Sequence, residues 1–200
     1  MERNNFDYSG EIKKQIEDCI SIKKNIADSH IEIIGKISKE IINAIKRKNK
    51  ILWMGNGGSA ADSQHLSCEL VSKFRMHRDA IPSIALTTNT SILTAISNDD
   101  GFEGIFERQV EALANDGDIL IGISTSGKSE NVIRAFKQGK KLGTINIAFT
   151  GNYTESVKNY VNYIISIPTA DTPRIQESHI MIGHIICDIV EKHLFGDRKY

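Results

Sequence analysis

The chain has 200 residues, which fits one ordinary domain with at most a small appendage. Hydrophobic residues make up 40% and charged residues 25%, a globular composition that excludes disordered, collagen-like and coiled-coil proteins. The 25 basic and 25 acidic side chains cancel, so a non-specific nucleic-acid binder, which is usually basic, is disfavoured.

The termini and the cysteines predict where the protein works. The N-terminal residues lack the apolar segment of a signal peptide. The most apolar C-terminal run, 180–190, is too short to span a bilayer. The three cysteines lie far apart and form no CxxC pair, which favours a reducing compartment. We therefore expect a soluble cytoplasmic protein with neither a membrane nor a nucleic-acid partner.

Residues 11–48 have the hydrophobic spacing of two helices. Isoleucines recur every three or four residues, at positions 12, 16, 20, 31, 34, 37, 41 and 45. We take residues 1–49 as an N-terminal helical hairpin that precedes a domain at 50–200.

From residue 50, short apolar runs alternate with helical patterns. Strands are predicted at 51–54, 81–88, 118–124, 144–150 and 160–168, with helices ending near residues 74, 114 and 142 and a last helix at about 173–195. This alternation predicts an α/β protein, a three-layer αβα sandwich with a flavodoxin-like five-stranded parallel sheet. Ligands of such folds bind beyond the carboxyl ends of the strands, here after residues 54, 88 and 123.

The first of these segments is glycine-rich and reads Gly55-Asn56-Gly57-Gly58-Ser59. Glycines let backbone N–H groups approach an anion at a helix start, and Ser59 can cap the following helix. A tight strand-to-helix turn that binds nothing explains the same residues.

The segment after the third strand carries four hydroxyl side chains within six residues, Ser124, Thr125, Ser126 and Ser129. One capping residue would suffice for a helix, so the excess favours a phosphate held by neutral donors and the helix dipole. Local hydrogen bonds to the backbone are the alternative.

Residues 122–129 also match the P-loop pattern GxxxxGKS between a strand and a helix. Gly122, however, falls inside the predicted strand. No later strand ends in the aspartate that would hold magnesium. We therefore regard a nucleotide-binding P-loop as the less favoured interpretation.

Candidate acid–base and metal-binding groups lie on two helices. His65 and Glu69 are four residues apart and share a helix face, where they suit a metal, acid–base chemistry or a simple exposed pair. On the apolar last helix, Gln176 and His184 are separated by about 80° around the axis, so both can reach one site. Polar groups in an apolar helix are costly unless they are paired.

Four segments in this order, GNGGSAADSQHLSCEL, AISNDDGF, GISTSGKS and TPRIQESHIMIGH, resemble the SIS-domain sugar isomerases, and among them the phosphoheptose isomerase family. The resemblance covers residues 50–195, and the N-terminal helices are similar to the family's usual leader. It implies a SIS fold and a homotetramer, with the N-terminal helices serving oligomerisation and active sites built between subunits.

The resemblance implies conversion of D-sedoheptulose 7-phosphate to D-glycero-D-manno-heptose 7-phosphate, the first step of ADP- or GDP-heptose biosynthesis. Glu69 and His184 carry over as the catalytic pair. Where family members bind zinc, the ligands carry over to His65, Glu69, Gln176 and His184, one ion per site. The implied substrate contacts are Asn56, Gly57, Gly58, Glu69, Asn98, Asp99, Ser124, Thr125, Ser126, Ser129 and Gln176.

Aldose–ketose isomerisation proceeds through a cis-enediol and needs one base at the carbons and an acid–base group at the oxygens. Glu69 is assigned the first role and His184 the second, and zinc would polarise the carbonyl. A zinc-bound carboxylate is a weaker base, so the two roles of Glu69 compete.

The sequence departs from the resembled pattern at two lysines. Lys128 stands where many relatives have asparagine, and Lys73 where many have arginine. Lys128 would either help to bind the phosphate or, as we expect, point into solvent. Lysine at position 73 is not an equivalent donor to arginine, so it does not simply take over a contact made by arginine. The alternatives to an enzyme are a non-catalytic SIS protein of the replication-initiator-associating type and a P-loop nucleotide binder.

Overall fold

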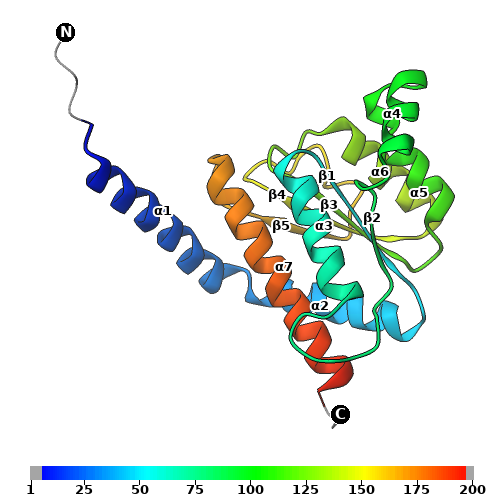
Figure 1. Cartoon of the computed structure of the whole chain (residues 1–200), viewed down its shortest axis with the longest axis horizontal. Helices are drawn as coiled ribbons and strands as arrows, with labels where there is room; N and C mark the ends of the chain where they lie inside the picture. The colour runs from blue at the N-terminus through cyan, green and yellow to red at the C-terminus, as the bar shows by residue number, and fades with distance from the viewer. Residues whose placement is uncertain (1–5, 197–200) are drawn as a thin grey trace.

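A computed structural model describes residues 6–196 of the chain (Figure 1). Its helices are α1 (Tyr8–Ser29), α2 (Ile31–Lys46), α3 (Gly58–Val71), α4 (Thr90–Asp99), η1 (Phe102–Gly104, a 3-10 helix), α5 (Glu107–Leu113), α6 (Glu130–Leu142) and α7 (Thr172–Phe195). Its strands are β1 (Ile51–Gly55), β2 (Ser83–Ala85), β3 (Ile119–Ser124), β4 (Ile145–Thr150) and β5 (Tyr163–Ser166). Residues 1–5 and 197–200, the outer ends of the two predicted segments, lie outside the described residues.

The five strands form one parallel sheet in the order β2-β1-β3-β4-β5. This is the flavodoxin-like order, so the predicted fold class is confirmed. Both faces of the central strands are buried, which explains why β1 and β3 read as continuous apolar runs rather than alternating patterns.

Helices cover both faces of the sheet. Trp53, Ile121 and Phe149 belong to a core shared with α2, α3 and α7. Leu52 and Leu120, their neighbours along the strands, belong to a second core shared with α5 and α6. Because successive strand residues point to opposite faces, this alternation produces the three layers.

The register aligns the carboxyl ends of the strands. Gly55 at the end of β1 pairs with Ile123, and Ser124 at the end of β3 pairs with Thr150. The glycine-rich loop and the hydroxyl-rich loop therefore leave the sheet at the same edge, as ligand-binding loops do in this topology.

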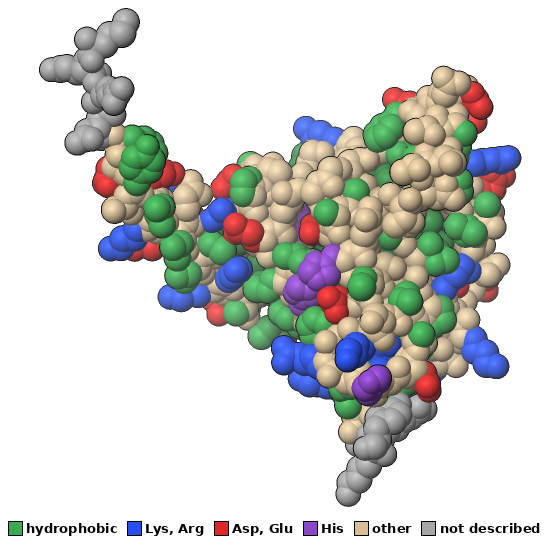
Figure 2. All heavy atoms as spheres, viewed as in Figure 1, with side chains coloured by type: hydrophobic (Ala, Val, Ile, Leu, Met, Phe, Trp, Pro, Cys, Tyr) green, Lys and Arg blue, Asp and Glu red, His purple; other side chains and the backbone are tan. Residues whose placement is uncertain are grey.

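Helix α1 projects away from the rest of the molecule (Figure 1). It is tied back near its middle, where Arg174 of α7 donates from Nη1 to the carbonyl of Gln15 at 2.6 Å. Hydrophobic side chains run along its length in Figure 2, and Ile12, Ile16 and Ile20 are 59%, 55% and 47% exposed.

Some element ends differ from the sequence-based expectation. The pattern expected to be helical up to residue 114 divides into α4, η1 and α5. Helix α3 ends at Val71 rather than near Phe74, because the backbone N–H groups of residues 74–76 bond to the Glu191 carboxylate instead of continuing the helix. None of the helices described in residues 6–196 has the length and hydrophobicity that crossing a bilayer requires.

Candidate active site

Three side chains from two helices meet in one cluster. His65 Nε2 lies 3.0 Å from Glu69 Oε1 on α3, and 3.4 Å from Nε2 of His184 on α7. One ligand atom from each of the three lies within 4.8 Å of the others, an arrangement that can hold a metal ion. Histidine side chains gather at the centre of the face shown in Figure 2, where α3 and α7 run side by side.

A glycine brings these two helices close together. Gly183 of α7 faces Leu66 of α3, and a Cβ at position 183 would lie 2.5 Å from two Leu66 methyl carbons. The next residue of α7 is His184, and the residue before Leu66 is His65. The close approach of the two helix backbones therefore places the two imidazole rings in contact, with centroids 4.9 Å apart.

The surroundings of His184 favour its neutral form. Burial lowers the pKa of His184, the neighbouring His65 lowers it further, and Glu69 acts in the opposite direction. The Phe74 ring lies 5.5 Å from the His184 ring and covers it on the side of the 72–82 loop. At neutral pH the imidazole is therefore available to accept a proton.

The glycine-rich loop lies against α7 and α6. Gly57 has a φ of +56° and occupies the N-cap position of α3, so Ser59 lies inside the first turn and does not cap the helix as expected. A Cβ on Gly58 would lie 2.4 Å from Nε2 of Gln176, which places the Gln176 amide directly over this loop. A side chain at position 58 would therefore displace the Gln176 amide from its place over the loop.

The hydroxyl-rich loop is tightly folded at the start of α6. Ser124 and Ser129 share a hydrogen bond of 2.9 Å, and Ser126 Oγ accepts from the Lys128 backbone N–H. Gly127, with a φ of +63°, packs against the Tyr153 carbonyl. Ser129 is at the N-cap position but its side chain makes no capping bond. A phosphate can accept hydrogen bonds from such hydroxyls and from the helix start.

The structure argues against a P-loop. Gly122, its first residue, is buried inside β3 and pairs with Ala148 of β4. A Cβ there would lie 2.5 Å from the Phe136 ring, so this glycine makes room for packing rather than for phosphate. Lys128 is exposed and rests over the Tyr153 ring, 4.3 Å from its centroid.

The remaining predicted site residues lie apart from this cluster. Asn98 and Asp99 are exposed at the end of α4, where the Asn98 amide donates to the Asp99 carboxylate at 2.7 Å. Helix α4 packs mainly on η1 rather than on α3 or α7. Lys73 is exposed in the loop after α3.

The structure also shows residues near the site that sequence reasoning missed. Asn131 of α6 and Asn56 exchange two amide hydrogen bonds, of 2.9 and 3.0 Å, which join the two candidate phosphate-binding loops. Phe74 lies against the His184 ring, and Arg78 bonds to the backbone of α3 and to Glu191 of α7. Buried asparagines and ion pairs are recognisable only when their distant partners are known, so no local pattern marks them.

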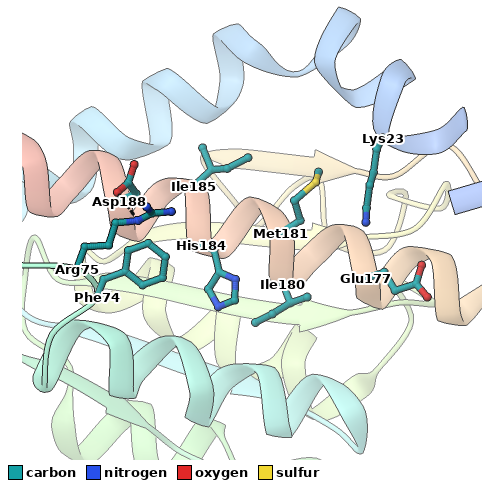
Figure 3. A pocket seen from close by; sticks show the side chains of 9 residues that line it. All are labelled: Lys23, Phe74, Arg75, Glu177, Ile180, Met181, His184, Ile185 and Asp188. Atoms are coloured by element: carbon teal, nitrogen blue, oxygen red, sulfur yellow. Dashed lines mark ion pairs between the residues drawn. The ribbon is translucent and has the colours of Figure 1, made fainter. Parts of the chain in front are cut away.

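A cavity of about 450 Å³ opens beside His184 (Figure 3). It lies between α1 and α7 and is lined by Lys23, Phe74, Arg75, Glu177, Ile180, Met181, His184, Ile185 and Asp188. The hydroxyl-rich loop does not contribute to it. The cavity is lined by apolar side chains and by charged groups of both signs. It therefore lies open beside the His65–Glu69–His184 cluster and does not by itself form a complete sugar site.

Comparisons with known proteins give a consistent result. Residues 15–151 match the SIS domain family. The phosphoheptose isomerase of Clostridium acetobutylicum is 54% identical over 94% of this chain and 96% of its own, and that of Aquifex aeolicus is 49% identical over 90% and 95%.

Solved structures agree with this. A phosphoheptose isomerase from Francisella tularensis superimposes with a TM-score of 0.90 at 34% identity, covering 94% of this chain and all of that one. The phosphoheptose isomerase from Neisseria gonorrhoeae gives a TM-score of 0.88 at 35% identity, covering 93% and 100%.

Proposed function

Because this chain belongs to the phosphoheptose isomerases of the SIS-domain family, we propose that it converts D-sedoheptulose 7-phosphate to D-glycero-D-manno-heptose 7-phosphate. It is an aldose–ketose isomerase. The observation that carries the proposal is the cluster of His65, Glu69 and His184 at one edge of the molecule's α3–α7 layer. The buried position of Gly122 inside β3 argues against a P-loop nucleotide binder. A non-catalytic SIS protein would not need the Glu69–His184 acid–base pair.

The substrate phosphate is proposed to bind at the start of α6. Ser124, Thr125, Ser126 and Ser129 would supply neutral donors there, and the helix dipole would favour the negative charge. The Asn56–Asn131 amide pair supports this placement, because it fixes the sugar-binding loop relative to the phosphate-binding loop. Asn56, Gly57, Gly58 and Gln176 would then contact the sugar, together with Asn98 and Asp99.

The isomerisation itself is assigned to Glu69 and His184. The Glu69 carboxylate, 20% exposed, removes the proton from one of the two reacting carbons and returns it to the other. His184, neutral at pH 7 because burial and His65 lower its pKa, exchanges protons with the substrate oxygens. A cis-enediol connects the ketose and the aldose.

The same residues fit a zinc ion. Two imidazole Nε2 atoms and a carboxylate oxygen converge, and these are the donor types that zinc prefers. We propose His65, Glu69, Gln176 and His184 as ligands of one ion, which when bound would polarise the substrate carbonyl as a Lewis acid. Holding the Glu69 carboxylate in its charged form would weaken it as a base.

A homotetramer with active sites between subunits is proposed as the working form. The exposed isoleucine stripe of α1 supports self-association, because monomeric proteins seldom leave such a stripe in water on a helix that projects from the body. The open cavity beside His184 lies next to the same helix. A second copy of the chain would enclose it.

The deciding experiment is proton NMR of sedoheptulose 7-phosphate in deuterated water with the purified protein, run with and without added zinc. We expect signals of the aldose heptose 7-phosphate, with deuterium at C2 where the enediol exchanges its proton with solvent. Absence of conversion in both conditions by a folded protein would refute the assignment. A rate that rises with zinc would support a role for the metal in turnover.

A further inference from the structure

Two buried side chains outside the catalytic cluster connect the helices that carry it. Arg78 lies in the loop after α3 and Glu191 lies on α7, and Arg78 Nε donates to Glu191 Oε1 at 2.9 Å. The two side chains are 0% and 1% exposed. A buried ion pair gives little net stability compared with apolar packing. Its presence here therefore favours a role in positioning α3 and α7.

Glu191 organises the loop that covers His184. Its carboxylate accepts hydrogen bonds from the backbone N–H groups of Phe74 at 3.0 Å, Arg75 at 2.7 Å and Met76 at 2.9 Å. Burial alone would raise the pKa of this carboxyl, but the three N–H groups and Arg78 hold it below its usual value, so Glu191 is ionised at neutral pH. Phe74, fixed in this way, lies against the His184 ring.

Arg78 holds the end of α3. Its Nη2 donates to the carbonyl of Glu69 at 2.9 Å and its Nη1 to the carbonyl of Leu70 at 2.8 Å. These carbonyls belong to the last turn of the helix, which lacks intrahelical partners. One planar guanidinium therefore binds the backbone of the proposed base and the carboxylate of α7 together.

Glu191 and His184 lie on the same side of α7. Glu191 follows His184 by seven residues, about two helical turns, and so lies on nearly the same side of α7. Cys187 lies between them, and burial together with the Glu69 and Glu191 carboxylates raises its pKa to about 12. Both carboxylates, one from α3 and one from α7, are therefore close enough to act on the same buried thiol.

We propose that the Arg78–Glu191 pair is a positioning device for the isomerisation, which sets the separation of α3 and α7 and thereby the approach of Glu69 to His184. This inference rests on the proposed function. Neither residue touches the cluster itself with its side chain: Arg78 acts through the Glu69 backbone, and Glu191 acts through Phe74.

The chain offers a matched control in a second buried ion pair, whose two residues belong to neither α3 nor α7. Asp118, 1% exposed, pairs with Lys50 and also accepts from the backbone N–H groups of Lys50 at 3.0 Å and Asn115 at 2.7 Å. Asp118 lies just before β3, and its hydrogen-bond partners among the described residues are Asn49, Lys50 and Asn115. Glu191→Gln and Asp118→Asn thus make the same chemical change in two similar buried ion pairs.

The test compares kcat and KM of the two variants with wild type, after folding has been verified by circular dichroism. For Glu191→Gln we expect kcat to fall about 10- to 100-fold, the range caused by small misplacement of reacting groups, with KM changed by less than about 3-fold. KM is spared because the phosphate loop lies on β3 and α6. For Asp118→Asn we expect a lower Tm and an unchanged kcat.

A wild-type kcat in folded Glu191→Gln would overturn the proposal. An equal loss of kcat in Glu191→Gln and Asp118→Asn would overturn it as well. If Glu191→Gln does not fold, Phe74→Leu replaces it, because Phe74 is only partly buried. A lower kcat with a normal KM in Phe74→Leu would support the inference, and a wild-type kcat in this variant would contradict it. Wild-type protein without isomerase activity would instead refute the proposed function, so the two failures are distinguishable.

Discussion

At the scale of single residues, the proposed chemistry depends on Glu69 being a free carboxylate. Replacing it with glutamine keeps the shape and the hydrogen bond to His65 but removes the base. We expect Glu69→Gln to fold normally and to lose turnover by about 10²- to 10⁴-fold, the usual contribution of a general base. Initial rates on sedoheptulose 7-phosphate measure this.

The exposed Glu111 of α5 provides a control for that substitution. Glu111 pairs only with Arg108 in the described contacts and lies outside the proposed site. Glu111→Gln is expected to retain the wild-type rate. Equal rates for Glu69→Gln and wild type would show that another group removes the proton.

His179 is a second residue whose protonation has a measurable effect, here on stability. It is fully buried, hydrogen-bonds from Nε2 to the Thr150 carbonyl at 3.1 Å, and burial lowers its pKa to about 4. The unfolded chain takes up a proton near pH 6.5, the ordinary pKa of histidine, whereas the folded protein does so only near pH 4. The stabilisation is therefore complete above pH 6.5 and is lost as the pH falls towards 4.

This predicts a specific difference between His179→Gln and wild type. Between pH 6.5 and 5, the wild-type free energy of unfolding should fall by up to about 1.4 kcal/mol per pH unit more than that of the variant. Urea titrations at three pH values measure the slopes. Parallel slopes would mean that His179 takes up its proton over the same pH range in the folded and unfolded states.

At the scale of the elements, the contact between α3 and α7 determines the site. Gly183→Ala improves helix propensity by about 1 kcal/mol, but its Cβ would overlap Leu66, and overpacking of this kind costs about 1 to 3 kcal/mol. We expect a net loss of stability together with a lower kcat, because the helices that carry His65 and His184 are forced apart.

A double-mutant cycle tests the cause. In a Leu66→Val background the two δ-methyl groups that cause the closest overlaps are gone, so Gly183→Ala should cost about 1 kcal/mol less than it does alone. Thermal or chemical denaturation of wild type, the two single variants and the double variant gives the coupling free energy between positions 66 and 183. Additive effects would indicate that the glycine is needed for a reason other than space.

At the scale of the whole molecule, self-association through α1 is the main expectation. A charge in the middle of the isoleucine stripe should oppose burial of that stripe, so Ile16→Glu is expected to reduce the assembled mass seen by analytical ultracentrifugation. Ser21→Glu is the control, since Ser21 is exposed and points roughly 140° away from Ile16 around the helix. An unchanged mass for Ile16→Glu would place the interface elsewhere.

The sequence predicted the architecture well because each parallel strand is a compact apolar run bounded by turns. The glycine-rich loop, the hydroxyl-rich loop and the His65–Glu69 pair could also be located from the sequence, since glycine, serine and helical spacing are local signals; their roles in binding and catalysis stay predictions. The Asn56–Asn131 and Arg78–Glu191 contacts were not, because their partners are 75 and 113 residues apart. The hydrophobic periodicity of the α4–η1–α5 segment predicts helix but is too weak to show where the helix is interrupted.

The position of α7 has a consequence for synthesis of the chain. This helix contributes Ile175, Ile182, Ile186 and Val190 to the core beneath α2 and α3, and it also carries His184. It is translated after all five strands, so a nascent chain lacking it exposes one apolar face of its sheet and has only one of the two proposed catalytic side chains. Closure of the core and completion of the site thus occur together, and a prematurely terminated chain is at once inactive and a substrate for quality-control proteases.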